Sequence, residues 1–127
     1  MNEIMQGIAA ALGEIGCDAE GTLMGRCLFR DDFAGFGGHF PERPILPAIV
    51  EILTVVALVG AHQGRRQRLL AVEDAKFLKP VLPGQELALR CRPRTVQGKE
   101  LYDAELSVGD ATTAILLLAL APAGEPA

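Results

Sequence analysis

The sequence predicts an α+β domain in which one buried helix packs against antiparallel strands. Between residues 49 and 61 the only charged residue is Glu51, and a helix that is apolar on nearly every face is normally enclosed by protein. Four strand candidates follow it, separated by turn signals at a spacing typical of an antiparallel meander. With 127 residues, half of them hydrophobic, the chain is long enough for one domain with a sizeable core.

The N-terminal segment is predicted to be a short amphipathic helix over residues 1–16. Its apolar residues recur at helical spacing, and Gly16 is expected to end it. These apolar residues are Ile4, Met5, Ile8, Leu12 and Ile15. The helix has no basic face, so we expect it to pack on the core rather than on a membrane. Residues 22–30 are predicted to form the first strand.

A rigid loop leads into the apolar helix. Residues 31–38 are rich in turn formers, and three prolines follow, Pro41, Pro44 and Pro47. Each proline restricts φ and removes a donor, which favours a stiff, extended approach. Pro47 suits the first turn of a helix, and residues 60–64 contain the glycines expected to end it. The apolar run is too short to span a bilayer, which takes about 20 residues.

The strands after the helix are predicted at residues 69–78, 86–92, 101–108 and 113–120. Pro83-Gly84, Gln97-Gly98 and Gly109-Asp110 are the turns that separate them. The last strand is apolar on both faces, so we expect it to be central or covered by a partner. Residues 121–127 are predicted to be a frayed tail.

Two motifs resemble those of a known family. The segment Gly38-His39-Phe40-Pro41-x-x-Pro44-x-x-Pro47 resembles the signature of the β-hydroxyacyl-acyl-carrier-protein dehydratases, and residues 76–84 resemble a second motif of that family. The resemblance covers residues 21–120. It implies a single hot-dog domain over residues 1–127, in which a curved antiparallel sheet wraps around one long helix.

The resemblance also implies a site. Dehydration of a 3-hydroxyacyl thioester removes a proton from C2, for which His39 is the expected base because its pKa lies near the working pH. Backbone N–H groups of Ala48 and Ile49, at the helix N-terminus, are the expected donors to the thioester oxygen. The residues expected to contact the substrate are Phe40, Ile52, Leu53, Val55 and Val56.

The chain departs from the family pattern at the acid. The family places Asp or Glu fourteen residues after the motif histidine, where this chain has Leu53, and Ala57 replaces the family's glutamine four residues later. Glu51 is the nearest carboxylate. Two residues rotate about 200° around a helix, so Glu51 should face nearly opposite to Leu53. Glu51 is either the acid, or a side chain that the helix dipole stabilises and that completes a capping interaction.

These features predict a dehydratase-like lyase that converts 3-hydroxyacyl to 2-enoyl thioesters of acyl-carrier protein, in fatty-acid or related lipid or polyketide biosynthesis. One alternative is an acyl thioesterase that uses Glu51. Another is a non-catalytic subunit that binds acyl-carrier protein or pairs with an active hot-dog relative. A homodimer or higher homo-oligomer is expected, because a single curved sheet leaves an edge strand to cover.

Composition bounds the remaining possibilities. A net charge of −4, no Trp and one Tyr argue against nucleic-acid binding. Cys17, Cys27 and Cys91 lack metal-like spacing and suit a reducing cytoplasm. We expect no metal and no cofactor apart from the phosphopantetheine that carries the substrate. The basic cluster Arg65, Arg66 and Arg68 is either a solvated turn or a docking patch for an acidic carrier.

Overall fold

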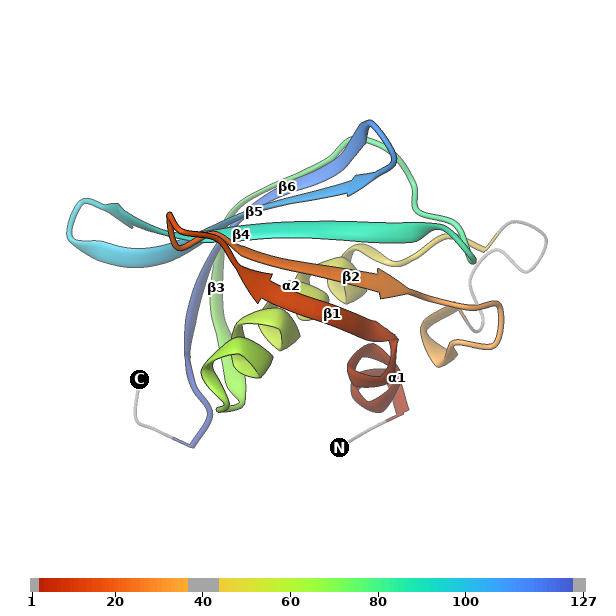
Figure 1. The fold of residues 1–127 in the computed structure, drawn as a ribbon, viewed down its shortest axis with the longest axis horizontal. Helices are drawn as coiled ribbons and strands as arrows, with labels where there is room; N and C mark the ends of the chain where they lie inside the picture. Colours follow the sequence, from red (N-terminus) through yellow and green to blue (C-terminus); the bar gives the residue numbers. More distant parts are fainter. Residues whose placement is uncertain (1–2, 37–43, 125–127) are drawn as a thin grey trace.

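The computed structural model describes residues 3–36 and 44–124 (Figure 1). Within them, the helices and strands follow in this order: α1 Glu3–Ala11, β1 Leu12–Cys17, β2 Leu23–Leu28, the 3-10 helix η1 Ala34–Phe36, α2 Ala48–Gln63, β3 Gln67–Phe77, β4 Glu86–Val96, β5 Lys99–Val108 and β6 Ala111–Pro122. The strands form one antiparallel sheet in the order β1-β2-β4-β5-β6-β3.

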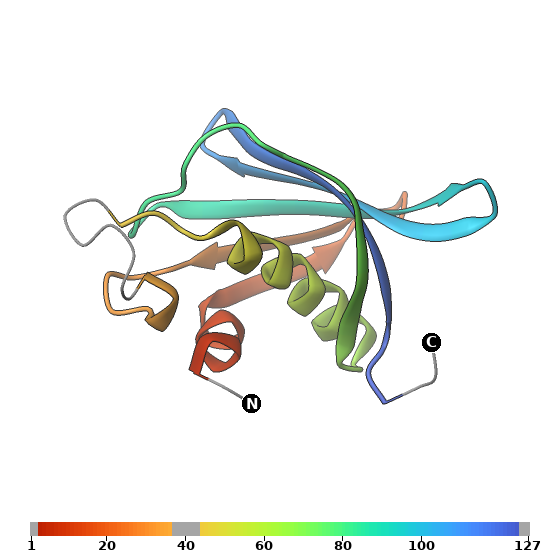
Figure 2. The ribbon, with the colours of Figure 1, turned by 180° about the vertical axis from the view of Figure 1, so that it is seen from behind.

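The sheet curves around α2, which lies along its inner face (Figures 1 and 2). This is the hot-dog arrangement, and the predicted fold class is confirmed. The β4–β5–β6 meander turns at Gln97-Gly98 and at Gly109, where φ is positive, as predicted. The apolar strand β6 lies between β5 and β3, so its expected central position is also confirmed.

Both ends of α2 are set by local sequence. Pro47 is the N-cap, with extended backbone, and Gly64 ends the helix in the left-handed conformation at φ 68°. The Gly64 N–H donates to the Gly60 carbonyl, which satisfies one of the free carbonyl groups at the helix end. The predicted limits of this helix are therefore confirmed to within a residue or two.

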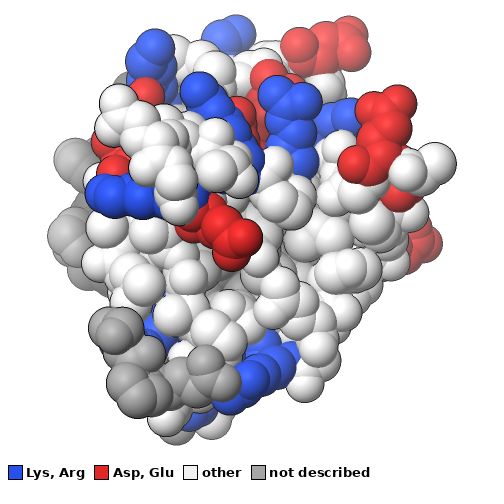
Figure 3. Space-filling view, turned by 90° about the vertical axis from the view of Figure 1, so that its left-hand side faces the viewer, with Lys and Arg blue, Asp and Glu red and all other residues white. Residues whose placement is uncertain are grey.

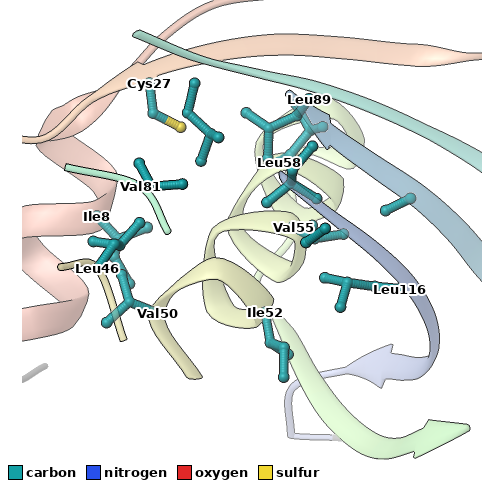
Figure 4. Close-up of a cluster of buried hydrophobic side chains, with 14 of the residues drawn as sticks. Ile8, Cys27, Leu46, Val50, Ile52, Val55, Leu58, Val81, Leu89 and Leu116 are labelled. Carbon is teal, nitrogen blue, oxygen red and sulfur yellow. The ribbon is translucent and has the colours of Figure 1, made fainter. Parts of the chain in front are cut away.

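The core lies between α2 and the sheet. Val55 and Leu58 of α2 are fully buried in one cluster with Leu89 of β4 and Leu116 of β6 (Figure 4). Near the start of α2, Ile8 of α1 joins the same cluster. Each fully buried side chain of this size contributes about 1.5–3 kcal/mol relative to exposure. No helix among the described residues is long and apolar enough to cross a membrane.

The prediction of a helix over residues 1–16 is wrong in its second half. The helix α1 ends at Ala11, and Leu12 begins strand β1, which pairs with β2 in the sheet. Gly13 and Gly16 disfavour the helix, whereas extended backbone gains ladder hydrogen bonds along β2. Ile15, expected on the buried face of a helix, is 41% exposed on the strand.

The prediction of a frayed tail over residues 121–127 is also wrong as far as Gly124. Strand β6 continues to Pro122, which pairs with Gln67 of β3. The N–H of Ala123 then donates to the carbonyl of Arg66 at 2.8 Å. These bonds hold the chain beside β3, and residues 125–127 lie outside the described residues.

The cysteines are unpaired. Cys27 and Cys91 lie on neighbouring strands but not opposite each other, because Cys27 pairs with Leu87 and Cys91 with Leu23. Burial raises the pKa of both thiols to about 12, with Asp103 adding to the effect at Cys91. The two buried thiols therefore stay protonated and behave as small apolar side chains.

Candidate functional site

The predicted site is built around the N-terminus of α2. The segment that enters the helix is anchored by a hydrogen bond from the Leu46 N–H to the carbonyl of Val81, at 2.8 Å. Leu46 and Val81 are both buried, so this bond fixes the start of α2 against the segment between β3 and β4. The predicted base His39 and the contact residue Phe40 lie outside the described residues.

The helix presents two stripes of different character. Glu51, Thr54, Val55 and Leu58 lie on the side that packs against the sheet, and all are buried. The other stripe is formed by Ile49, Leu53 and Ala57, four residues apart. Ile49 is 52% exposed, and the other two are half-buried and pack against the margin of the core. We call this less buried side of the helix the outward stripe. The expectation that Glu51 and Leu53 face in nearly opposite directions agrees with these exposures.

Glu51 is a buried carboxyl group in the first turn of α2. Glu51 is only 4% exposed, and its Oε1 has no hydrogen-bond partner in the described part of the chain. Burial raises its pKa from 4.5 to about 7. A buried polar atom with no partner is uncommon, so Glu51 is a candidate for a role in chemistry.

The predicted capping interaction of Glu51 is not formed. A capping glutamate would accept a hydrogen bond from the N–H of the N-cap residue, and here that residue is Pro47, which has none. The helix dipole favours a carboxylate in the first turn by about 0.3–1 kcal/mol. The raised pKa corresponds to about 3 kcal/mol against the charge, so desolvation outweighs the dipole.

The expected oxyanion donors, the N–H groups of Ala48 and Ile49, belong to the first turn of α2. The helix's own hydrogen bonds begin with the N–H groups of Val50 and Glu51, both of which donate to the carbonyl of Pro47. The N–H groups of Ala48 and Ile49 therefore have no partner within the helix. Both residues are exposed, so a ligand oxygen can approach this end of the helix.

The predicted contact residues on α2 separate into two groups. Ile52, Val55 and Val56 are buried within the chain, with exposures of 7%, 0% and 3%. Leu53 instead lies half-buried on the outward stripe. The structure therefore does not bring all four side chains to one surface, and their contact with substrate stays a prediction.

No other carboxyl group accompanies Glu51 in the core of the described residues. The remaining buried polar residues there are Thr22, Thr54, Gln67 and Thr113. The hydroxyl of Thr54, which the sequence did not single out, donates to the Val50 carbonyl at 2.7 Å and so is already satisfied. In the described ranges no group of three or more His, Cys, Asp or Glu is placed to hold a metal ion.

A groove of about 530 Å³ lies elsewhere, between α1 and the segment from the end of β2 to η1. Its walls include Gly7, Phe29 and Phe33, and among the described residues that line it none is a predicted site residue. It is wide open to solvent and does not reach the start of α2. We therefore assign it no part in the site.

The basic cluster lies at the other end of α2. Arg65 and Arg66 are exposed in the turn before β3, and Arg68 is half-buried on that strand. On the face of the molecule seen in Figure 3, basic and acidic side chains are interspersed above a broad uncharged area. The two interpretations of the cluster, a solvated turn and a docking patch for an acidic carrier, both stay predictions.

Comparison with known proteins places the chain in a family. Residues 17–113 match the family described as ApeI-like, ApeI dehydratase. A 3-hydroxyacyl-[acyl-carrier-protein] dehydratase FabZ of Alkalilimnicola ehrlichii is 30% identical over 90 residues, which are 62% of this chain and 58% of that protein. The FabZ protein of Novosphingobium aromaticivorans is 43% identical over 63 residues, 42% of this chain and 40% of the relative. The chain thus matches roughly half the length of these relatives.

Solved structures give the same fold. The dehydratase heterocomplex ApeI:P from Xenorhabdus doucetiae aligns with a TM-score of 0.72 at 23% identity, over 86% of this chain and 95% of that one. The PaaI protein of Escherichia coli aligns with a TM-score of 0.63 at 19% identity, over 90% of this chain and 86% of that one. The hot-dog fold and the family match over residues 17–113 lead to one conclusion: this chain belongs to the ApeI-like dehydratases.

Proposed function

We propose that the chain interconverts 3-hydroxyacyl and 2-enoyl thioesters carried on the phosphopantetheine of acyl-carrier protein. The observation that carries the proposal is the carboxyl group of Glu51, which is buried in the first turn of α2 and has one oxygen without a hydrogen-bond partner in residues 3–36 and 44–124. A carboxyl group whose pKa is raised to about 7 is suited to donate and recover a proton near neutral pH. The family match supports this reaction class over others.

The proposed steps divide the chemistry among three groups. His39 removes the proton from C2, and the charge that develops on the thioester oxygen is stabilised by the N–H groups of Ala48 and Ile49. Such donors act without reorganising, because the helix holds them in place. Glu51 protonates the C3 hydroxyl group, which leaves as water. No cofactor takes part beyond the phosphopantetheine thioester, and the acyl chain follows α2.

We also propose that two copies associate through β3. This strand is an edge of the sheet, and an edge strand exposes backbone groups that can pair with another chain. It carries exposed apolar side chains at Leu70, Val72 and Phe77. The outward stripe of Ile49, Leu53 and Ala57 on α2 likewise needs cover, and a second copy meets both requirements.

A specific observation favours one alternative. Leu53 and Ala57 leave the outward stripe of α2 without a group that carries a proton, which a non-catalytic subunit paired with an active hot-dog relative would tolerate. The ApeI:P structure is a heterocomplex. Under this alternative the chain binds acyl-carrier protein but has no turnover of its own. Either way we place it in the cytoplasm, whose reducing conditions suit its unpaired cysteines.

The experiment is incubation of the purified chain with 3-hydroxyacyl- and 2-enoyl-carrier-protein substrates, followed by mass spectrometry of the acyl group. We expect reversible hydration by the wild type and a loss of about 10²–10⁴ in rate for His39→Ala and for Glu51→Gln. Glu14→Gln, which changes an exposed carboxylate on β1, is the matched control. Thioester hydrolysis that depends on Glu51 would instead identify an acyl thioesterase, and carrier binding without turnover a partner subunit.

A further inference from the structure

The free edge of β3 carries two opposite charges that lie symmetrically about one residue (Figures 1 and 2). Arg68, Ala71 and Asp74 pair with residues 121, 119 and 117 of β6, which is every second residue of that strand. Alternate residues of a strand lie on the same face of its sheet. Leu118, between two of these β6 positions, is fully buried in the core. The three β3 residues therefore lie on the outer face, with Ala71 midway between the charges.

The edge of β3 has features that normally prevent a foreign strand from pairing with it. The register of β3 against β6 shifts between Leu69 and Ala71, and again between Val72 and Asp74. Such bulges, like charged side chains, protect an edge strand from unspecific pairing. Asp74 is exposed and has no ion-pair partner among the described residues. A strand that pairs here must therefore supply a positive charge opposite Asp74.

A second β3 supplies this charge in one register. Two copies related by a twofold axis form an antiparallel pair in which each contact occurs twice. With Ala71 on the axis, Arg68 of each copy lies opposite Asp74 of the other. With Val72 on the axis, Arg68 would lie opposite Lys76, and with Asp74 on the axis two carboxylates would meet. A shift by one step in the other direction places Arg68 opposite Ala71 and forms no ion pair. Opposite charges across a strand pair stabilise it, and like charges destabilise it.

We infer that two copies pair along β3 with Ala71 on the twofold axis, so that Arg68 of each copy binds Asp74 of the other. The inference rests on the association of copies proposed above and deepens it, because it commits the partner to a second copy of this chain. On the inner face of the sheet, the same register places Val72 opposite Leu69. It thereby covers a valine that is 42% exposed in the single chain.

One like-charge contact accompanies this register. Lys76 lies opposite the turn that precedes β3 of the second copy, where Arg66 is exposed. Both side chains are exposed, so salt screens their repulsion. The two Arg68–Asp74 pairs lie closer to the axis and decide the register.

Reversed charges test the contact between copies. Arg68→Asp and Asp74→Arg, each alone, should raise the dimer dissociation constant about tenfold, because both ion pairs become like-charge contacts. A mixture of the two variant chains should form mixed dimers with the wild-type dissociation constant, since each contact again joins opposite charges. Sedimentation velocity measures these constants, and Arg92→Asp, exposed on β4, is the control. A mixture that dimerises no better than its separate components would overturn the inference.

A disulfide locates the axis. In a Cys17→Ser background, which lacks the exposed thiol, Ala71→Cys brings two thiols directly opposite each other. Opposite residues of an antiparallel pair have Cα atoms about 4.5–5.5 Å apart, which suits a disulfide. Mild oxidation should therefore link these chains into a covalent dimer. Ala75→Cys, three ladder positions along β6 from Ala71, should stay unlinked, and the reverse result would overturn the inference.

Failure of the proposed association has a different signature. If the wild type sediments as a monomer at every concentration measured, the association through β3 falls and the register falls with it. If the wild type is a dimer and Ala71→Cys does not crosslink, dimer formation stands and the register is wrong. Neither measurement uses the dehydration reaction, so an inactive dimer would refute the proposed chemistry and leave the register in place.

Discussion

Replacement of Glu51 by glutamine should remove a pH-dependent loss of stability. Glutamine keeps the size of the side chain but cannot ionise. In the wild type, burial raises the pKa of Glu51 from 4.5 to about 7. Below pH 4.5 the carboxyl group is protonated in both the folded and the unfolded chain, and it contributes no difference between them.

Between pH 4.5 and 7 the unfolded chain loses this proton and the folded chain keeps it, so the unfolded chain binds fewer protons. The free energy of unfolding therefore falls as the pH rises through this window. Since each unit of pKa difference corresponds to about 1.4 kcal/mol, the change from 4.5 to about 7 corresponds to about 3 kcal/mol, fully lost above pH 7.

The assay is urea unfolding followed by far-UV circular dichroism, because the chain has no Trp. Unfolding free energies of the wild type and of Glu51→Gln are measured at pH 4.5 and pH 8 at one protein concentration. The variant should gain about 3 kcal/mol relative to the wild type between the two pH values. Glu14→Gln, exposed on β1, is the control. A difference between Glu51→Gln and wild type that is independent of pH would refute the reasoning, since it would mean that the carboxylate reaches water or a partner.

Three further changes test the fold and the association of copies. Gly64→Ala should destabilise the chain by about 1 kcal/mol, because the left-handed backbone at this position is unfavourable for alanine. A Cβ at position 64 would meet no atom, so the cost comes from the backbone alone. Thermal unfolding measures this cost, and an unchanged melting temperature would contradict the role of Gly64 in ending α2. Leu58→Ala should lower the free energy of unfolding by about 2–5 kcal/mol, because it leaves a cavity in the core. Leu82→Ala, at an exposed position, should lower it far less. Equal losses of unfolding free energy would mean that Leu58 does not fill the core. Val72→Asp on β3 should convert dimers to monomers in light scattering, whereas Ile115→Asp on β6, where the side chain is similarly exposed, should not. Dimers that survive Val72→Asp would place the contact elsewhere.

The sequence predicted the main helix and the meander because local signals agreed there with the tertiary structure. Glycine occupies each position of positive φ that ends α2 or turns the meander, apart from Gln97 beside Gly98. The apolar run of α2 has few polar interruptions, and the structure buries most of it. Where turn chemistry and burial both point to one structure, the order of elements can be read with little ambiguity.

The sequence failed where pairing with a distant strand decided the structure. The spacing of Leu12 and Ile15 fits a helix, yet these residues pair with β2. Strand β4 was expected to end at residue 92, but it continues through Pro93 to Val96. Pairing of β4 with β2 ends at Cys91, so Pro93 lies on a local edge, where a missing donor is tolerated.

The candidate site was predictable in part. The different directions of Glu51 and Leu53 follow from helix geometry alone, and the structure buries Glu51 more deeply than Leu53. The sequence could not show that Glu51 would be buried with Oε1 lacking a hydrogen-bond partner among the described residues. The burial of Glu51 depends on how closely α2 packs against the sheet. Its missing capping bond follows from Pro47 at the N-cap, because proline has no N–H to donate.

The most direct test of the proposed chemistry is hydration of a 2-enoyl-carrier substrate in D₂O, with mass spectrometry of the acyl product. Proton transfer at C2 predicts a 3-hydroxyacyl thioester that retains one deuterium at C2 with the wild type. Glu51→Gln should form this product about 10²–10⁴ times more slowly. Release of a free acid without deuterium at C2, or equal rates for the two proteins, would contradict the account.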